Sequence, residues 1–178
     1  KKQAVGLGDR CYHIAVCIAN RPDMPEYQWL SDIEPLQNGE VARIVEATGN
    51  HWRKILNIYA KLMFLLDAKE QPPGKPTETL AAQSGSGHAL IFSTTLPPSA
   101  ENGVVYIVSG KQHAQTLGVL DSAIDLGEGF YLEPAKNLVI TPYFDYRQLS
   151  NRKLDMLISI INNDMSARAP TGNDLQPI

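Results

Sequence analysis

Four short apolar runs constrain the fold of this chain more than any other feature of its sequence. They lie at residues 13–19, 89–93, 104–108 and 138–140, and each is nearly continuous rather than alternating between apolar and polar residues. A strand with this pattern is covered on both of its faces, as in a parallel sheet. Long connections and helical patterns separate the runs. We therefore expect an α/β domain of three layers, with a four-stranded, mainly parallel sheet between helices.

The strongest helical pattern spans residues 50–66, where apolar side chains, Trp52 among them, recur three and four positions apart. Asn50 is the expected N-cap of this helix, and Gly49 lets the chain turn into it. A short extended piece is expected at residues 130–132. Shorter helices are expected at residues 39–46, at residues 111–117 with Gly118 as the closing glycine, and after Ser150 as the N-cap of the last helix.

The length of 178 residues predicts a single α/β domain over residues 1–178, with its core at about 13–163. Residues 70–87 are rich in proline, glycine and small polar side chains, which is typical of a flexible loop. Residues 164–178 read as a loose tail. The net charge of −3 argues against a generally basic, phosphate-binding protein, but it does not exclude a local basic groove.

The sequence predicts a cytoplasmic protein with no membrane partner. No apolar run approaches the ~18 residues of a membrane span, and the first residues lack the apolar segment of a secretory signal. Cys11 and Cys17 lie six positions apart in an extended stretch, too far apart for a disulfide, so both thiols are expected to be reduced. We find no spacing typical of a metal site and expect no cofactor.

The ends of the four apolar runs are the expected ligand-binding region. In open α/β sheets, ligands bind outside the carboxyl ends of the strands. Small or polar residues follow each run at this edge. With Asn50, the expected ligand-binding residues are Asn20, Arg21, Pro22, Ser93, Thr94, Gly110, Lys111, His113, Thr141 and Tyr143.

Familiar catalytic motifs do not fit the chain. Gly110 and Lys111 follow a strand, but the spacing from Gly103 is wrong for a P-loop and Gln112 cannot supply the magnesium-binding hydroxyl. No G-x-S-x-G elbow is present. His51 and His113 fall in the first turns of helices, where a solvated or hydrogen-bonded role is expected. No catalytic residue is assigned from these patterns.

Several segments together resemble the uracil-DNA glycosylase superfamily. Residues 15–22 read Ala-Val-Cys-Ile-Ala-Asn-Arg-Pro and are similar to the superfamily's first-strand motif. Residues 49–56, Gly-Asn-His-Trp-Arg-Lys-Ile-Leu, are similar to a segment of the mismatch-type thymine and uracil glycosylases. Residues 90–96, 105–114 and 139–143 resemble later strand ends. The resemblance implies a parallel sheet in the spatial order second, first, third, fourth run, with a base pocket at the strand ends.

Three positions depart from the pattern of that superfamily. Arg21 stands where an Asp or Asn positions the hydrolytic water, and arginine stays protonated, so it cannot act as a general base. Asn20 could do that work only if the alignment shifts by one residue. Ser93 stands where an Asn reads the base, and Thr141 stands where a His stabilises charge on the base. The resemblance therefore predicts a relative without base-excision activity.

The expected function is binding of a small anionic or nucleotide-like ligand, or of nucleic acid, at the carboxyl ends of the strands. Arg21 and Lys111 would supply positive potential there, because guanidinium groups bind phosphate and carboxylate in a bidentate fashion. Alternatively, Arg21 pairs at the surface with Asp23 or Glu26.

Two other classes of function stay open at this point. The first is an interaction or structural domain, such as a homo-oligomer, with Trp29, Tyr143 and Phe144 as exposed anchors. The second is a hydrolase of unrecognised type that uses Asn20, Arg21 and His113.

Overall fold

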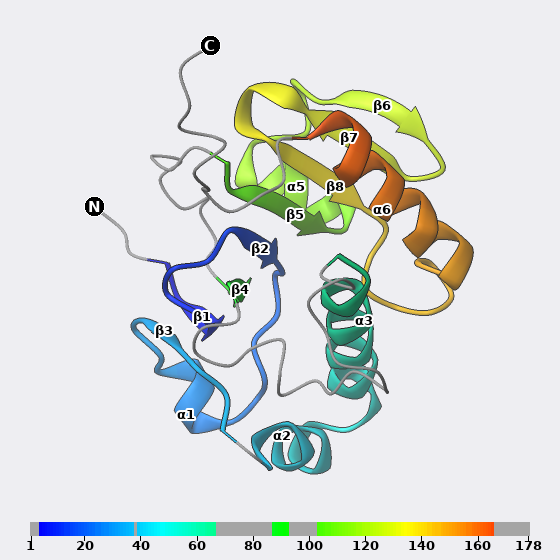
Figure 1. Cartoon of the computed structure of the whole chain (residues 1–178). Coiled ribbons are helices and arrows are strands. Elements are labelled where there is room, and N and C mark those ends of the chain that lie inside the picture. The colour runs from blue at the N-terminus through cyan, green and yellow to red at the C-terminus, as the bar shows by residue number, and fades with distance from the viewer. Residues whose placement is uncertain (1–3, 38, 67–86, 93–102, 166–178) are drawn as a thin grey trace.

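The computed structural model describes residues 4–37, 39–66, 87–92 and 103–165 (Figure 1). The expected loop at 70–87 and tail at 164–178 therefore lie almost entirely outside the described residues, as do Ser93 and Thr94. The strands are β1 (Gly6–Gly8), β2 (Ile14–Cys17), β3 (Ile33–Glu34), β4 (His88–Ile91), β5 (Val105–Ser109), β6 (Ile124–Gly127), β7 (Phe130–Glu133) and β8 (Leu138–Thr141). The helices are α1 (Pro25–Gln28), α2 (Glu40–Thr48), α3 (Asn50–Leu66), α5 (Lys111–Leu117), the 3-10 turn η2 (Pro134–Lys136) and α6 (Asn151–Asp164).

The strands form one mixed sheet in the order β3-β1-β4-β2-β5-β8-β7-β6. Its centre, β4-β2-β5-β8, is parallel throughout and holds the four apolar runs in the expected spatial order. The expectation of four strands was wrong, because the described residues form eight. β1 pairs antiparallel with β4, and β7 and β6 extend the other edge as an antiparallel hairpin. The parallel strands are thus the middle of a wider sheet.

Two apolar cores, one on each face of the sheet, confirm the three layers. Successive residues of a strand point to opposite faces, so Val16 joins the core under α3 and α6, while Ala15 and Cys17 join the core under α5. All three side chains are at most 1% exposed. β2 is therefore covered on both faces, as its continuous apolar pattern predicts.

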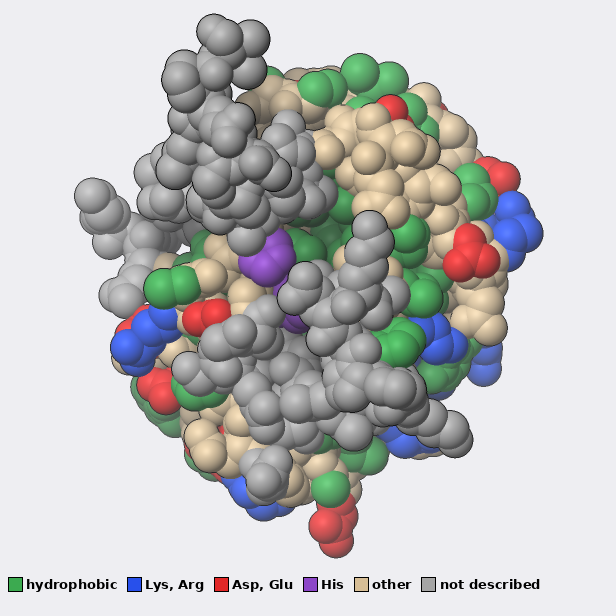
Figure 2. Space-filling model, in the orientation of Figure 1, with side chains coloured by type: hydrophobic (Ala, Val, Ile, Leu, Met, Phe, Trp, Pro, Cys, Tyr) green, Lys and Arg blue, Asp and Glu red, His purple; other side chains and the backbone are tan. Residues whose placement is uncertain are grey.

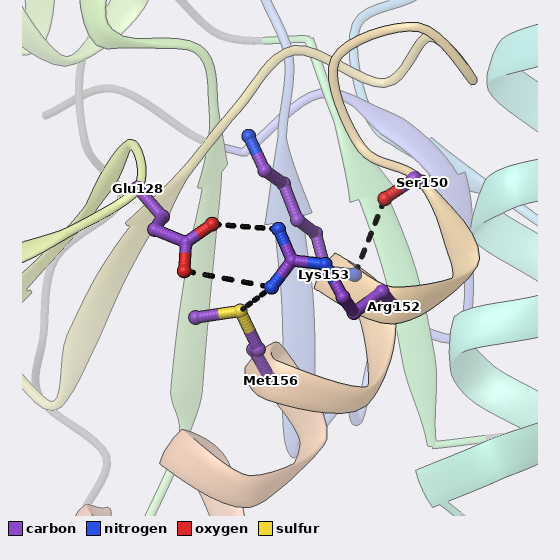
Figure 3. Close-up of polar contacts among 5 residues, drawn as sticks. All are labelled: Glu128, Ser150, Arg152, Lys153 and Met156. Carbon is purple, nitrogen blue, oxygen red and sulfur yellow. Dashed lines mark hydrogen bonds and ion pairs between the residues drawn. The ribbon is translucent and has the colours of Figure 1, made fainter.

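The expected helices are present, with one correction at a helix start. α3 has the expected bounds, but Asn50 is its first residue rather than its N-cap, and the Asn50 side-chain oxygen accepts a hydrogen bond from Arg53 Nε at 3.1 Å. α5 ends at Gly118, whose φ of 75° is the left-handed conformation typical of a closing glycine. Ser150 is the N-cap of α6, and its side chain accepts a hydrogen bond from Lys153 N (Figure 3).

β1 was not expected from the sequence, and it depends on two glycines. A Cβ at Gly6 would lie 2.0 Å from Leu90 O, and one at Gly8 would lie 2.4 Å from His88 O. Both atoms belong to β4, the antiparallel neighbour of β1. Only residues without a side chain permit this close approach of two backbones.

An ion pair joins the β6–β7 hairpin to α6. Glu128, at the hairpin turn with a φ of 56°, accepts hydrogen bonds from Arg152 Nη2 at 2.7 Å and Nη1 at 3.5 Å (Figure 3). The hydrogen bond and charge of Arg152 lower the pKa of the Glu128 carboxyl. Both side chains are largely exposed, so this pair orients the hairpin at the surface and adds little to overall stability.

No helix in the described part of the chain is long and apolar enough to cross a membrane.

Replacing Trp52 tests the core under α3. Trp52 is 4% exposed and meets Phe92 edge to face, with ring centroids 5.9 Å apart. Trp52→Ala should lower the free energy of unfolding by about 3 to 5 kcal/mol, because it opens a cavity in the core. Trp29, which is 83% exposed, provides the matched control. Trp29→Ala should change stability by no more than about 0.5 kcal/mol. Chemical denaturation measures both, and a loss below about 1 kcal/mol for Trp52→Ala would contradict the core assignment.

Candidate functional site

Three polar side chains meet at the carboxyl edge of the parallel strands. Asn20 follows β2, Tyr143 follows β8, and His51 lies in the first turn of α3. The Tyr143 hydroxyl donates a hydrogen bond to Asn20 Oδ1 at 2.8 Å and lies 3.1 Å from His51 Nε2. We call these three residues the Asn20–His51–Tyr143 cluster.

The fold explains why residues so distant in sequence meet here. β2 and β8 both pair in parallel with β5, so their carboxyl ends reach the same edge of the sheet. Gly49, with a φ of 92°, turns the chain between α2 and α3 and sets the first turn of α3 against this edge. The rings of His51 and Tyr143 stack there, with centroids 6.0 Å apart and planes at 28°.

The backbone around the ends of β5 and β8 fixes the position of Tyr143. Gly110 N donates to Thr141 O at 2.8 Å, and Ser109 Oγ accepts from Phe144 N at 3.1 Å. Gly110 has a φ of 95°, which favours glycine, and a Cβ there would lie 3.4 Å from the Tyr143 ring, an ordinary van der Waals contact. Phe144 is completely buried, which makes its expected role as an exposed anchor wrong.

Burial and one nearby negative charge keep Tyr143 in its protonated form. Burial, and then the negative charge of Asp145, raise the pKa of Tyr143. The hydrogen bond from Arg147 N is the main cause that lowers the pKa of Asp145, and the positive charges of Lys54 and Arg147 lower it further. Asp145 is therefore a carboxylate, and it pairs with Lys54 at 3.8 Å. The phenol keeps its proton and remains a hydrogen-bond donor.

Arg21 is anchored to the backbone of α1. Its Nη1 donates to Tyr27 O and Gln28 O, each at 3.0 Å, and these carbonyls form the last turn of α1. The alternative of a surface pair with Asp23 or Glu26 was wrong, since no ion pair joins Arg21 to either residue in the described part of the chain and Glu26 pairs with Arg43 at 3.9 Å. Pro22, also an expected site residue, is buried, and its carbonyl accepts from the Gln28 side chain at 3.0 Å.

Three other expected site residues direct their side chains to partners outside the cluster. Lys111 is exposed, and its ammonium group lies 5.9 Å from the centre of the Tyr131 ring. Thr141 is buried, and its hydroxyl donates to Pro142 O at 2.7 Å. Asn50 is exposed and contacts Arg53. The structure therefore joins only Asn20 and Tyr143 among the expected residues whose side chains it describes.

His51 is the site residue that sequence reasoning missed. The available signal was its place in residues 49–56, the segment that resembles the mismatch-type glycosylases. A hydrogen-bonded role was foreseen for it, but not the partner, which lies in another part of the sequence. Within the residues that the structure describes, no group of three or more His, Cys, Asp or Glu side chains could hold a metal ion.

His113 is buried, which differs from the solvated or hydrogen-bonded role expected for it. Its side chain is 6% exposed, and its Nε2 has no hydrogen-bond partner among the described residues. An unsatisfied buried polar atom costs about 1 to 3 kcal/mol. Burial also lowers the pKa of His113, because a charged imidazolium is disfavoured away from water.

Replacing His113 tests this reading. His113→Leu removes the unsatisfied nitrogen, so we expect the free energy of unfolding at neutral pH to rise by up to about 1 to 3 kcal/mol. The wild-type protein should also lose stability relative to the variant as the pH falls below 6.5, the ordinary pKa of His, because the unfolded chain takes up the proton first. Denaturant unfolding at several pH values measures both effects. A loss above about 1 kcal/mol at neutral pH would instead show that Nε2 has a partner.

The comparisons with known proteins identify a family. Residues 5–162 match the family model described as "Family of unknown function (DUF6942)". No curated protein and no solved structure matches the chain. The matched residues include Asn20, His51 and Tyr143 and cover most of the 178 residues. The chain therefore belongs to DUF6942, a family of unknown function.

Proposed function

We propose that this chain is a cytoplasmic, uracil-DNA glycosylase-like domain that lacks base-excision activity and binds a nucleotide-like ligand. The Asn20–His51–Tyr143 cluster is the observation that carries the proposal. It places three polar side chains from separate elements at the carboxyl edge of four parallel strands, where ligands of α/β sheets bind.

The arrangement of the central sheet supports the proposed relationship. The order β4-β2-β5-β8, with all neighbours parallel, is the one that the resemblance implies. Asn20 contacts the cluster while Arg21 binds the carbonyls of α1. This favours an alignment shifted by one residue, in which Asn20 stands at the water-positioning site of the superfamily.

The proposed lack of excision rests on Thr141 and Ser93. Thr141 stands where the superfamily has its charge-stabilising His, and its buried hydroxyl is directed to Pro142 O rather than to the cluster. A threonine carries no positive charge that could stabilise a departing base. Ser93, at the base-reading position, lacks the paired donor and acceptor of an asparagine amide.

The chemistry of the cluster suits a flat polar ligand. Aromatic side chains provide stacking surfaces for bases, and the rings of His51 and Tyr143 lie together at this edge. Arg21 has further N–H groups besides the Nη1 that holds α1, and a guanidinium held in place suits a phosphate. On the face in Figure 2, acidic and basic side chains lie beside one another near the outline of the molecule, and this mixture of charges favours a small ligand over a long nucleic acid.

An interaction domain is the second candidate. Its support is the exposure of large apolar side chains, with Trp29 83%, Ile124 53% and Leu126 41% exposed. Ile124 and Leu126 lie on β6, the strand at one edge of the sheet. Exposed apolar side chains on an edge strand are typical of surfaces that contact another protein chain.

The first test is an excision assay. The purified protein should release no uracil or thymine from single-stranded or mismatched DNA, because the superfamily's base-reading and charge-stabilising residues are replaced. Cleavage of the resulting abasic sites by alkali, seen on a denaturing gel, measures release, and an active glycosylase serves as the positive control. Release that disappears in Asn20→Ala would overturn this part of the proposal and restore the enzyme interpretation.

The second test is nucleotide binding, measured through the change in melting temperature of the protein. Nucleoside 5′-monophosphates or short oligonucleotides at about 100 times the dissociation constant should stabilise the protein by about 2.7 kcal/mol. Asn20→Ala and Arg21→Ala should abolish this shift, each variant being compared with its own ligand-free form. The contribution of Arg21 should weaken with salt.

Arg152→Ala is the matched control for this test. Like Arg21→Ala it removes one arginine charge, but from α6, and it should leave the ligand-induced shift in melting temperature unchanged. An unchanged melting temperature with every nucleotide would contradict ligand binding and leave the interaction domain as the function.

A further inference from the structure

The hydroxyl of Tyr143 has two hydrogen-bond partners but carries one proton. It donates that proton to Asn20 Oδ1, since a side-chain carbonyl oxygen only accepts. The second contact, of 3.1 Å with His51 Nε2, must then run in the opposite direction. His51 Nε2 therefore carries a hydrogen and donates it to the Tyr143 oxygen.

The direction of this hydrogen bond determines whether the other ring nitrogen of His51, Nδ1, is a donor or an acceptor. In a neutral imidazole, one nitrogen is a donor and the other an acceptor. With its hydrogen on Nε2, His51 has its free electron pair on Nδ1. The side chain of His51 is exposed, and no hydrogen bond to Nδ1 occurs within the described part of the chain. Nδ1 is thus an acceptor that a ligand can reach.

We propose that His51 Nδ1 is the acceptor by which this site selects its ligand, and that it requires an N–H group on the flat ring of that ligand. The inference rests on the proposed function, because it concerns the same site. Tyr143 acts as a positioning residue: its hydroxyl holds the tautomer and its ring stacks on the imidazole. The neighbouring Trp52, buried in the core, holds the start of α3 in place.

The arrangement of Asn20 reinforces this selection. Asn20 Oδ1 accepts the hydrogen bond from Tyr143, which leaves the donor NH₂ group of Asn20 as the group that it can offer a ligand besides the second lone pair of Oδ1. The cluster as a whole therefore offers a ligand the N–H donors of Asn20 and an aromatic-nitrogen acceptor at His51 Nδ1. A ligand that lacks a donor would leave Nδ1 without a partner once water is displaced, which weakens binding.

The tautomer can be read in the free protein by long-range ¹H–¹⁵N NMR of the four histidines at alkaline pH, where imidazoles are neutral. His51→Leu assigns the His51 signals by their loss. We expect a protonated, pyrrole-type Nε2 and an unprotonated, pyridine-type Nδ1. Tyr143→Phe should shift the Nε2 signal, because the acceptor of its hydrogen is lost. A hydrogen on Nδ1 would overturn the inference, since Tyr143 would then donate to Nε2.

Ligand selection is tested with two probes, uridine 5′-monophosphate and its N3-methyl derivative. Methylation removes the one N–H of the uracil ring and leaves the charge unchanged. We expect the methylated nucleotide to bind about tenfold more weakly to the wild-type protein. His51→Leu should bind both nucleotides equally, and His51→Gln, which keeps an N–H for Tyr143 and an amide oxygen as acceptor, should restore part of the difference.

Equal affinity of the wild-type protein for both probes would overturn the proposed selection. Failure of the proposed function is distinguishable from this result. If neither probe nor any other nucleotide binds, the proposed function fails, and the ligand selection fails with it. If nucleotides bind but NMR places the hydrogen on Nδ1, the inference fails while the proposed function stands.

Discussion

The parallel pairing of β2 on both of its sides is the interaction on which the rest of this structure depends. β2 pairs with β4 along one edge and with β5 along the other, and its four residues are at most 4% exposed. It also contributes side chains to both apolar cores. The layers on the two faces thus share one strand, and the end of that strand places Asn20 at the carboxyl edge.

The central strands could be predicted because burial on both faces requires a continuous run of apolar residues, which is visible in the sequence. In a chain of this size, a continuous apolar run such as residues 104–108 has few stable structures open to it other than a strand that is covered on both faces. β1, β3 and β6 have no such apolar run. β1 is Gly-Leu-Gly, β3 has two residues, and β6 is exposed along its whole length. These strands form because a neighbouring strand offers backbone groups for hydrogen bonds. That pairing is a tertiary contact, which the local sequence does not reveal.

The candidate site was predicted in part, for similar reasons. Strand ends pointed to Asn20 and Tyr143, but sequence spacing cannot reveal that a hydroxyl from one end bonds an amide from another. The anchoring of Arg21 was not predicted, because α1 was not expected. Pro25 occupies the first position of that helix, where its missing N–H costs nothing. The carbonyls at the end of that helix then bind the guanidinium.

The pairing of β2 also has a consequence for synthesis on the ribosome. Ile14 pairs with His88 and Val105, and Leu7 pairs with Leu90, so both early strands depend on partners that are translated much later. Contacts between such distant residues slow folding, whereas the neighbouring helices α2 and α3 make local contacts that form early. A nascent chain that ends before His88 therefore holds an apolar strand without a sheet to join. Until β4 and β5 are translated, this unpaired apolar strand makes the nascent chain prone to aggregation.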